Sequence, residues 1–294
     1  MDHLDYPKNL REFDRRFAHK DACLLFLEQV RWGDDFRCQA CGSQEYWKLS
    51  TGLRRCRACR FKNSVKTGTV FESSRLPLKM WFYAIWWITA QKAVVSALDL
   101  QKDIGLGSYR SAWLLLHKIR SAMTHADRIL LQGEVEVDET YLGAELVIVA
   151  AEFSGLKQLG RICVGRLRDT SAAQRENFLV ANVAHGSIIH TNGAKGYGDL
   201  ARLGFIHVPN ILTKPARAQL LPRVQIVCDF LRKWLRSALH GRVDSKHLGR
   251  YLEEFVFRFN RRTSKTRGLL FQRVMENAVR TKPVPYKKIV ARRT

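Results

Sequence analysis

The sequence lacks any hydrophobic run long enough to cross a bilayer, which needs about 20 apolar residues. The longest candidate, residues 80–90, is shorter than that and is followed at once by Gln91 and Lys92. The N-terminal stretch also lacks the apolar region of a secretory signal peptide. These absences predict a cytoplasmic protein with no membrane partner, in a reducing compartment. We therefore expect the seven cysteines to be metal ligands or buried thiols and not disulfides.

Acidic residues are also scarce: 27 Asp and Glu stand against 50 Lys and Arg. The formal net charge of +23 and the isoelectric point near 10.1 favour a polyanionic partner, because clustered cations bind phosphates in a salt-dependent way. We expect that partner to be nucleic acid. A soluble protein that is merely basic, or one that binds acidic lipid, is the alternative.

Four of the cysteines form two CxxC pairs, Cys38 with Cys41 and Cys56 with Cys59, separated by fourteen residues. Each pair lets two thiolates face one point, and two such pairs complete a tetrahedral site suited to structural Zn²⁺. Four ligands leave no position for a reacting water, so this metal is expected to fold the segment and do no chemistry. A redox dithiol is the alternative. The remaining cysteines stand in apolar surroundings and are expected to be small core residues: Cys23, Cys163 and Cys228.

The ribbon segment is rich in cations, and arginines held on a rigid hairpin suit contact with DNA phosphates. A solvated basic face is the alternative. The candidate DNA-binding residues of this segment are Arg54, Arg55, Arg57 and Arg60.

A helix–turn–helix is predicted after the ribbon. Helical spacing covers residues 94–102, a turn with two glycines follows, and Ser108 is placed to cap a second helix that extends to residue 123. An ordinary helical hairpin is the alternative. The second helix would turn these residues toward a DNA groove: Tyr109, Arg110 and further along His117 and Lys118.

Three carboxylates alternate with valines in residues 133–142, GEVEVDETYL. A strand would place Glu134, Glu136 and Asp138 on one face. Because Mg²⁺ prefers oxygen ligands, this face is a candidate metal site for phosphoryl transfer. An exposed edge strand with a solvated acidic face is the alternative.

The pattern that follows is strand, strand, helix, strand, loop and strand. This order is that of a ribonuclease H-like fold, one of several α/β arrangements that periodicity allows. The expected elements are strands at 146–151, 160–166, 187–191 and 205–208, with a helix at 171–182.

Several motifs occurring in one order resemble the zinc-ribbon group of insertion-sequence transposases, which have a DDE-type, ribonuclease H-like core. The resemblance extends over nearly the whole chain and implies an α+β multidomain protein that binds double-stranded DNA at transposon ends. It also implies DNA cleavage and strand transfer with Mg²⁺ or Mn²⁺, carried out by a homo-oligomer on paired ends. The motifs are RCQACG with RRCRACR, KTGTVFESSRLPLKMWF, SALDLQKDIGLGSYRSAWLLLHKIRSAM, EVEVDETYLG, HTNGAKGYGDLARLGFIH and HGRVDSKHLGRYLEEFVFRFNRR.

The resemblance also implies a catalytic set and shows where this chain departs from it. Asp138 matches the first catalytic aspartate, whereas Asn192 stands where the family has its second. At the third position, where relatives commonly have His, this chain has Gln225, and Asp229 lies one helical turn further on. Ala144 replaces a glycine in a segment that looks shortened. An amide supplies no charge, so these changes should weaken Mg²⁺ binding.

Basic residues near the C-terminus could grip DNA on either side of the scissile bond: Arg258, Arg261 and Arg262. The expected domains are an N-terminal helical segment (1–35), a zinc ribbon (36–75), a helix–turn–helix-like segment (76–130), a ribonuclease H-like core with a mixed sheet (131–280) and a basic tail (281–294).

Three functions remain open at this point. The first is a transposase, active or impaired, and the second is a catalytically inactive DNA-binding regulator or relic derived from one. The third is a zinc-ribbon protein that acts through protein partners.

Overall fold

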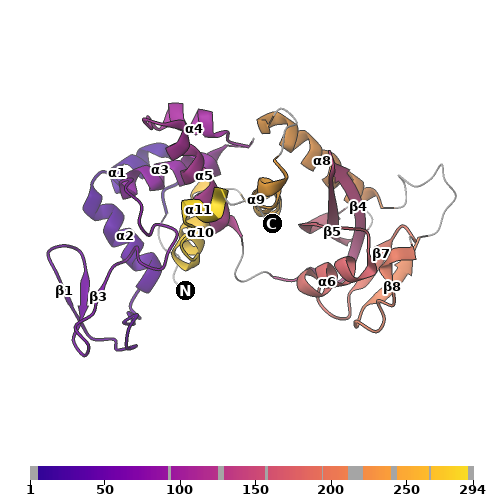
Figure 1. The fold of residues 1–294 in the computed structure, drawn as a ribbon, viewed down its shortest axis with the longest axis horizontal. Helices are drawn as coiled ribbons and strands as arrows, with labels where there is room; N and C mark the ends of the chain where they lie inside the picture. Colours follow the sequence, from indigo (N-terminus) through magenta and orange to yellow (C-terminus); the bar gives the residue numbers. More distant parts are fainter. Residues whose placement is uncertain are drawn as a thin grey trace. The chain divides into compact units, whose positions relative to one another are not determined.

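The computed structural model describes residues 6–91, 94–124, 129–155, 158–193, 195–210, 221–239, 244–264 and 266–290. Contacts divide the chain into two compact units (Figure 1). Unit 1 comprises Met1–Ala126 and Ser264–Thr294, and unit 2 comprises Asp127–Thr263. Among the described residues, no helix is both long and apolar enough to span a membrane.

Unit 1 is a helical body that carries a small sheet. Its elements are α1 (Leu10–Arg16), α2 (Lys20–Trp32), β1 (Tyr46–Lys48), β2 (Arg54–Cys56), β3 (Lys62–Asn63), α3 (Leu78–Ala90), α4 (Ala97–Asp103), α5 (Tyr109–Met123), α10 (Arg267–Arg280) and α11 (Tyr286–Val290).

Helix α10 returns from the far end of the chain to the core of unit 1. The ring of Phe271 lies 5.7–6.1 Å, between centroids, from five aromatic rings of the first ninety residues: Phe13, Phe17, Phe26, Phe82 and Trp86. The structure therefore differs from the expected core of 131–280, because residues 264–280 belong to unit 1. Helical spacing alone could not show which core the apolar face of α10 would join.

Helices α4 and α5 follow each other with the Ser108 cap that the sequence predicts, and their role as a DNA-binding helix–turn–helix stays a prediction. Ser96 caps α4 by accepting from the Asp99 amide, and Ser108 caps α5 by accepting from the Ser111 amide. His117 and Lys118, however, are buried, so the expectation that they face a groove is wrong.

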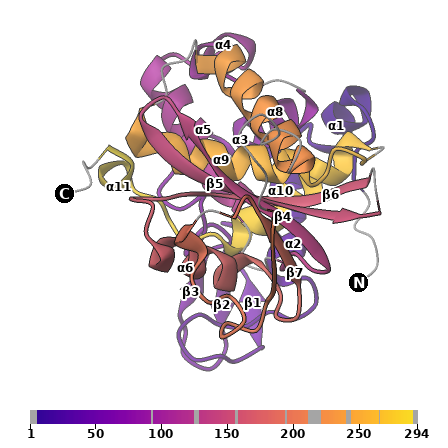
Figure 2. The ribbon, with the colours of Figure 1, turned by 90° about the vertical axis from the view of Figure 1, so that its right-hand side faces the viewer.

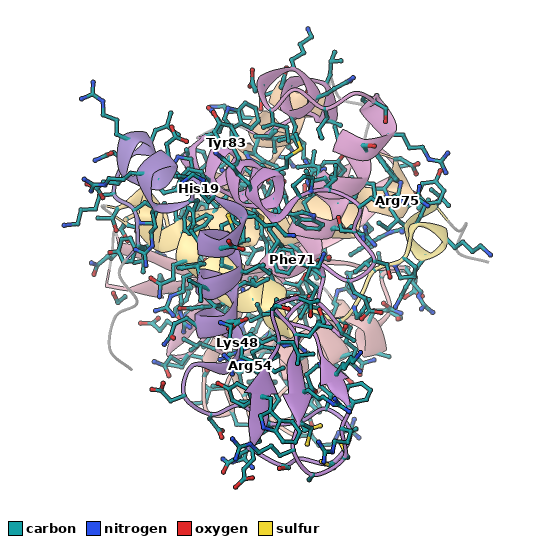
Figure 3. All side chains as sticks on the ribbon, turned by 90° about the vertical axis from the view of Figure 1, so that its left-hand side faces the viewer. His19, Lys48, Arg54, Phe71, Arg75 and Tyr83 are labelled. Atoms are coloured by element: carbon teal, nitrogen blue, oxygen red, sulfur yellow. The ribbon has the colours of Figure 1, made fainter. Side chains whose placement is uncertain are left out.

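The small sheet is antiparallel, in the order β1–β2–β3, and is tied to α2 by ion pairs. Glu28 on α2 is buried and accepts from Arg54 at 3.1 Å and from Lys48 at 3.2 Å. Figure 3 labels both cations where the sheet meets the helical body. A buried carboxylate is stable only when paired, so this contact fixes the ribbon against α2.

Unit 2 contains one mixed five-stranded sheet in the order β6–β5–β4–β7–β8. The first three strands are antiparallel, and β7 and β8 run parallel to β4, which agrees with the ribonuclease H-like order. The elements are β4 (Glu134–Leu142), β5 (Glu145–Ser154), β6 (Gln158–Arg166), α6 (Ala172–Asn182), β7 (Ile188–Thr191), the 3₁₀ turn η1 (Lys195–Tyr197), β8 (Ile206–Pro209), α8 (Pro222–Leu239) and α9 (Ser245–Phe259).

Helices cover both faces of this sheet (Figure 2). Val135 and Val137 of β4 join the core on the α6 side, with Leu179. Val147 and Val149 of β5 point the other way and pack with α8 and α9. Because both faces are covered, the sheet offers polar chemistry mainly at the ends of its strands.

The outer edge of the sheet is closed by the C-terminal end of α9. Asn260 accepts from the backbone N–H of Ile162 at 2.7 Å and donates to its carbonyl at 2.9 Å, so the amide acts as a short neighbouring strand. Arg262 donates to the carbonyls of Leu159 and Gly160. Unpaired groups of an edge strand are thereby satisfied.

We predict that Asn260→Ala lowers the free energy of unfolding of unit 2 by about 2 kcal/mol, because two hydrogen bonds to Ile162 are lost at about 1 kcal/mol each. Urea denaturation measures the change, and faster hydrogen exchange at the Ile162 amide locates it. The exposed Lys233 on α8 provides a control, since Lys233→Ala should change stability by less than about 0.5 kcal/mol. Unchanged exchange at Ile162 would contradict the edge role.

Candidate functional site

The four predicted cysteines meet in one cluster in unit 1. The Sγ atoms of Cys38 and Cys59 lie 3.6 Å apart, as do those of Cys41 and Cys56, and all four lie within 4.8 Å of one another. A tetrahedral zinc site with Zn–S bonds of about 2.3 Å requires sulfur atoms roughly 3.8 Å apart. The residues therefore fit a structural zinc ion.

The two CxxC turns share one backbone design. Cys38 N–H donates to the Ser43 carbonyl and the Gly42 N–H donates to the Cys38 carbonyl. Cys56 and Arg60 repeat these two bonds in the second turn. Gly42 has a φ of +76° and Arg60 a φ of +64°, so the second turn holds a side chain where glycine is normally preferred.

Local hydrogen bonds favour the thiolate form of Cys38, the form that zinc requires. Burial alone would raise the pKa of Cys38, but donors including the Ala40 backbone and the Asn63 amide lower it to about 6. Asn63 lies 3.6 Å from this sulfur and is itself fully buried.

The candidate DNA-binding arginines of the ribbon separate into two groups. Arg54 is only 7% exposed, paired with Glu28 and stacked on Trp32 and Tyr46 at 4.4 Å, so it is a structural residue and not a surface contact. Arg55 is half-buried.

Two ribbon arginines do lie on the surface. Arg57 and Arg60 are exposed, and their guanidinium groups lie 5.6 and 4.6 Å from the ring of Trp47, which is itself exposed. At the start of α5, Tyr109 and Arg110 are exposed as well, with Arg110 over the ring of Tyr286 at 4.2 Å. These positions stay candidates for DNA contact.

The C-terminal candidates have mainly internal contacts. Arg258 forms a 2.8 Å ion pair with Glu254, whose side chain is fully buried. Arg261 lies over the Phe257 ring, and Arg262 is bound to the edge of β6. Arg258 therefore neutralises a buried acid, whereas Arg262 is exposed and stays a candidate for DNA contact.

Asp138 in the middle of β4 and Asn192 just after the end of β7 meet where the parallel pairing of the two strands stops. Glu136 of β4 pairs with His190 of β7, so the two positions two residues further on are also side by side. The Asn192 Nδ2 donates to the Asp138 Oδ1 at 2.9 Å. The same oxygen accepts from the Glu139 backbone N–H at 2.9 Å.

The other carboxylates of β4 are not part of this site. Glu134 pairs with His190 at 3.0 Å. Glu136 is 2% exposed and accepts from the backbone N–H groups of Arg223 and Val224 at 2.7 and 3.0 Å. The expectation that three carboxylates of one face share a metal is wrong, because the central one, Glu136, binds the N-terminus of α8.

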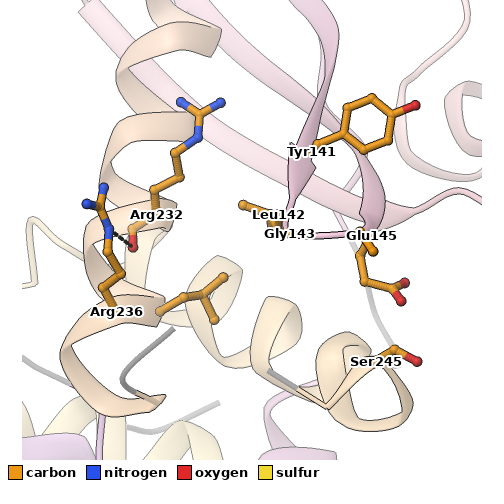
Figure 4. A pocket seen from close by; sticks show the side chains of 9 residues that line it. Tyr141, Leu142, Gly143, Glu145, Arg232, Arg236 and Ser245 are labelled. Carbon is orange, nitrogen blue, oxygen red and sulfur yellow. Dashed lines mark hydrogen bonds between the residues drawn. The ribbon is translucent and has the colours of Figure 1, made fainter. Parts of the chain in front are cut away.

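Beyond Glu136, α8 runs alongside β4. Arg232, one of the α8 residues labelled in Figure 4, donates to Thr140. Cys228 lies one helical turn before Arg232, and the charges of Asp138 and Asp229 both act on its thiol. Burial, aided by these two carboxylates, raises the pKa of Cys228 to about 12. The residue that α8 turns toward Asp138 is therefore a neutral, buried thiol.

The two candidates for the third ligand differ in their surroundings, and the identity of this ligand stays a prediction. Gln225 is half-buried on α8, and the Asp229 side chain is 66% exposed and paired with Arg232 at 3.1 Å. Within the part of the chain that the structure describes, the cysteine cluster alone gathers three or more ligand atoms from His, Cys, Asp or Glu side chains. One carboxylate and one amide therefore fit Mg²⁺ only in part.

A buried network next to Asp138 holds the loop that carries Asn192. The Glu139 carboxylate accepts from Arg175 at 2.5 Å and from the Tyr197 hydroxyl at 2.8 Å. Arg175 also donates to the Gly196 carbonyl, and a Cβ at Gly196 would meet its guanidinium at 1.9 Å. Burial and the Glu139 charge raise the pKa of Tyr197 well above its usual value, so its hydroxyl remains a donor.

Sequence reasoning missed this network. Gly196 and Tyr197 stand close to Asn192 in the same sequence motif, so the sequence could have indicated them as site residues. Arg175 gave none, because it lies in a helix whose register toward β4 depends on tertiary packing.

We predict that Cys56→Ser lowers the zinc content from about one ion per chain to nearly none and unfolds the ribbon, because a four-ligand shell loses a thiolate. Metal analysis and circular dichroism measure both effects. Cys163→Ser is the matched control: Cys163 is a buried thiol of β6, and the variant should keep its zinc. A ribbon that stays folded without metal would contradict the structural role.

Comparisons with known proteins support the same organisation. Residues 19–62 match the transposase zinc-ribbon domain family, and residues 143–260 match the ISXO2-like transposase domain family. The second match includes Asn192 and the α8 positions and begins just after the strand of Asp138. Together the two matches cover more than half of the chain.

A curated relative and two solved structures are also similar. An uncharacterized protein in transposable element ISH50 of Halobacterium salinarum is 31% identical over 136 residues, and the match spans 45% of each protein. The catalytic core domain of BIV integrase is 14% identical with a TM-score of 0.34, covering 47% of this chain and 89% of that one. A chain of the simian T-cell lymphotropic virus intasome, solved with the PP2A regulatory subunit B56 gamma, is 16% identical with a TM-score of 0.34, covering 60% and 70%.

The solved structures are too distant to carry a functional argument. The family matches stand on their own, because a zinc ribbon and a transposase core of one kind follow each other in the expected order. The chain belongs to the zinc-ribbon insertion-sequence transposases.

Proposed function

We propose that the protein acts in DNA transposition, binding element ends as an oligomer, with metal-dependent cleavage and strand transfer centred on Asp138 and impaired by its neighbours. The observation that carries this proposal is the contact between Asp138 of β4 and Asn192, the first residue after β7. The net charge of +23 supports a DNA partner.

Each residue of the site has a definable task in such a reaction. A bound Mg²⁺ or Mn²⁺ would polarise the scissile phosphate. Asp138 would hold that ion through its carboxylate, and Asn192 could offer its amide oxygen if the amide turned. Glu139, Arg175 and Tyr197 keep the loop after β7 against β4 and so fix the separation of the two ligands.

The impairment follows from the charge at position 192. Two carboxylates this close repel each other until a cation lies between them, and this repulsion favours metal binding. The Asn192 amide instead donates directly to Asp138 and satisfies it without a cation. Metal affinity should therefore be low, as should the cleavage rate.

A second candidate is a catalytically inactive DNA-binding protein. The same hydrogen bond favours it, together with the exposed Asp229 held by Arg232 and the neutral Gln225. DNA binding through the ribbon and α5 would persist in such a protein.

We predict that Asn192→Asp raises Mg²⁺-dependent cleavage of the protein's own terminal repeats at least about tenfold, because the second carboxylate strengthens the metal site. Zinc content and DNA affinity should stay unchanged. Gel analysis of end cleavage, with Mg²⁺ and with Mn²⁺, measures the rate. Adding Asp138→Asn to the variant should abolish the gain.

Asn9→Asp serves as the matched control, because it adds the same charge at the N-cap of α1, where aspartate can still accept from the Glu12 N–H although the Asn9 donor to the Glu12 carboxylate is lost. Cleavage by neither the unaltered protein nor Asn192→Asp, with DNA binding intact, would reject the transposase proposal in favour of the inactive protein. Robust strand transfer by the unaltered protein would reject the inactive candidate.

A further inference from the structure

The sheet of the zinc ribbon, formed by β1, β2 and β3 (Figure 3), has an outer face that carries cations around one tryptophan. Trp47, Arg55 and Lys62 are register partners across the three strands, so their side chains share that face. Their neighbours on β2 and β3 are buried on the opposite face. Arg57 and Arg60 extend the outer face, because their guanidinium groups lie 5.6 and 4.6 Å from the centroid of the Trp47 ring. We call these five residues the ribbon face.

Arg60 stands at a backbone position that favours glycine. The two CxxC turns have the same hydrogen bonds, and the equivalent position of the first turn is Gly42, with a φ of +76° against +64° at Arg60. A side chain at positive φ strains the backbone, so folding alone would favour glycine at both positions. The Arg60 side chain is exposed and lies over the ring of Trp47, which is exposed as well. Such strain is typical of positions whose side chain serves a function.

The charges of the ribbon face also oppose one another. Arg55 and Lys62 are directly opposite on β2 and β3, and like charges at such positions destabilise a sheet. Within the described part of the chain, none of the four cations forms an ion pair with a carboxylate. Glu45, whose carbonyl accepts from the Arg57 N–H at 3.0 Å, offsets at most one of the four positive charges. A polyanion that covered the ribbon face would relieve this repulsion.

We propose that the ribbon face grips the phosphate backbone of duplex DNA through Arg57 and Arg60, with Trp47 as the positioning residue that holds both guanidinium groups. The proposal rests on the DNA-binding function proposed above and assigns a surface to it. A long side chain loses rotamer freedom when it binds, and a guanidinium that already stacks on a ring has lost part of that freedom beforehand. A ring that stacks two guanidinium groups is a poor platform for a base, so the ribbon face suits a duplex backbone and not an unpaired strand.

The first test measures binding of a blunt duplex of random sequence by fluorescence anisotropy, over a range of salt concentrations and without Mg²⁺. Trp47→Ala should weaken binding about fivefold or more, because two guanidinium groups must then be ordered on binding. Trp47→Phe should keep most of the affinity, because phenylalanine also stacks a guanidinium. In a chain that carries Arg57→Ala and Arg60→Gly, Trp47→Ala should have almost no further effect, since Trp47 acts through these arginines.

Arg60→Gly separates DNA contact from folding. It should weaken duplex binding and lower the slope of log affinity against log salt by about one, because one phosphate contact is lost. The zinc content and the unfolding temperature of the ribbon should not fall, because glycine suits the positive φ at this position. Removing a merely structural arginine would lower both.

The matched control moves the cation to the other CxxC turn. Gly42→Arg combined with Arg60→Gly keeps the net charge, and a Cβ at Gly42 would meet no atom within 4 Å. This exchanged variant should bind the duplex as weakly as Arg60→Gly alone, because the cation has left the position that lies over Trp47. Its zinc content verifies that the ribbon is folded, and the Trp47 variants decide the question without it.

The outcomes separate this proposal from the function on which it rests. Full affinity in Trp47→Ala, an effect of Trp47→Ala that persists without both arginines, or recovery of affinity in the exchanged variant overturns the ribbon face and leaves DNA binding standing. Loss of zinc from Arg60→Gly makes Arg60 structural and overturns it as well. Failure of the unaltered protein to bind the duplex overturns both this proposal and the DNA-binding function.

Discussion

The register of α8 against β4 depends on the buried carboxylate of Glu136. Helix α8 begins at Pro222, and the residue before it, Leu221, has no side-chain oxygen to cap the first amides. Glu136 supplies the cap from a strand, accepting from two backbone N–H groups and from the Arg223 guanidinium at 2.7 Å. The helix dipole adds to the stabilisation. Replacing this carboxylate would leave buried donors unsatisfied and the helix without a fixed register.

The other contacts between α8 and β4 follow from this capping of α8 by Glu136. One helical turn rises about 5.4 Å, and two strand residues span about 6.7 Å, so successive turns of α8 meet alternate residues of β4. Cys228 thus comes to lie near Asp138, and Arg232 reaches Thr140. A buried thiol opposite Asp138 is a consequence of this register, as is the outward position of Asp229. The site's incompleteness therefore arises from which residues α8 carries at each turn.

The sequence predicted features whose geometry is local or set by strand pairing. CxxC spacing brings two sulfur atoms together within one turn, and the resemblance to the DDE transposases assigned Asp138 and Asn192 to one site, where the structure has them in contact. It did not predict the role of Arg54, because a cation in a basic segment becomes structural only when a buried acid such as Glu28 faces it from another element. The expected end of the core at residue 280 differs from the division after Thr263 for the same reason: the apolar face of α10 could join either core.

Buried ion pairs also determine which cations can carry the net charge of the protein. Arg54, Arg175 and Arg258 are each paired with a buried or nearly buried glutamate, and such pairs need both partners because an unpaired charge in the interior is costly. Each of these pairs is neutral, so it removes one cation and one anion from the count without changing the surplus. The +23 must therefore be carried by cations outside such pairs, and many of those described lie on the surface, among them Arg57, Arg60 and Arg236. A polyanion would meet an excess of positive charge that the interior does not neutralise, and this is the physical reason to expect DNA binding even if the metal site is weak.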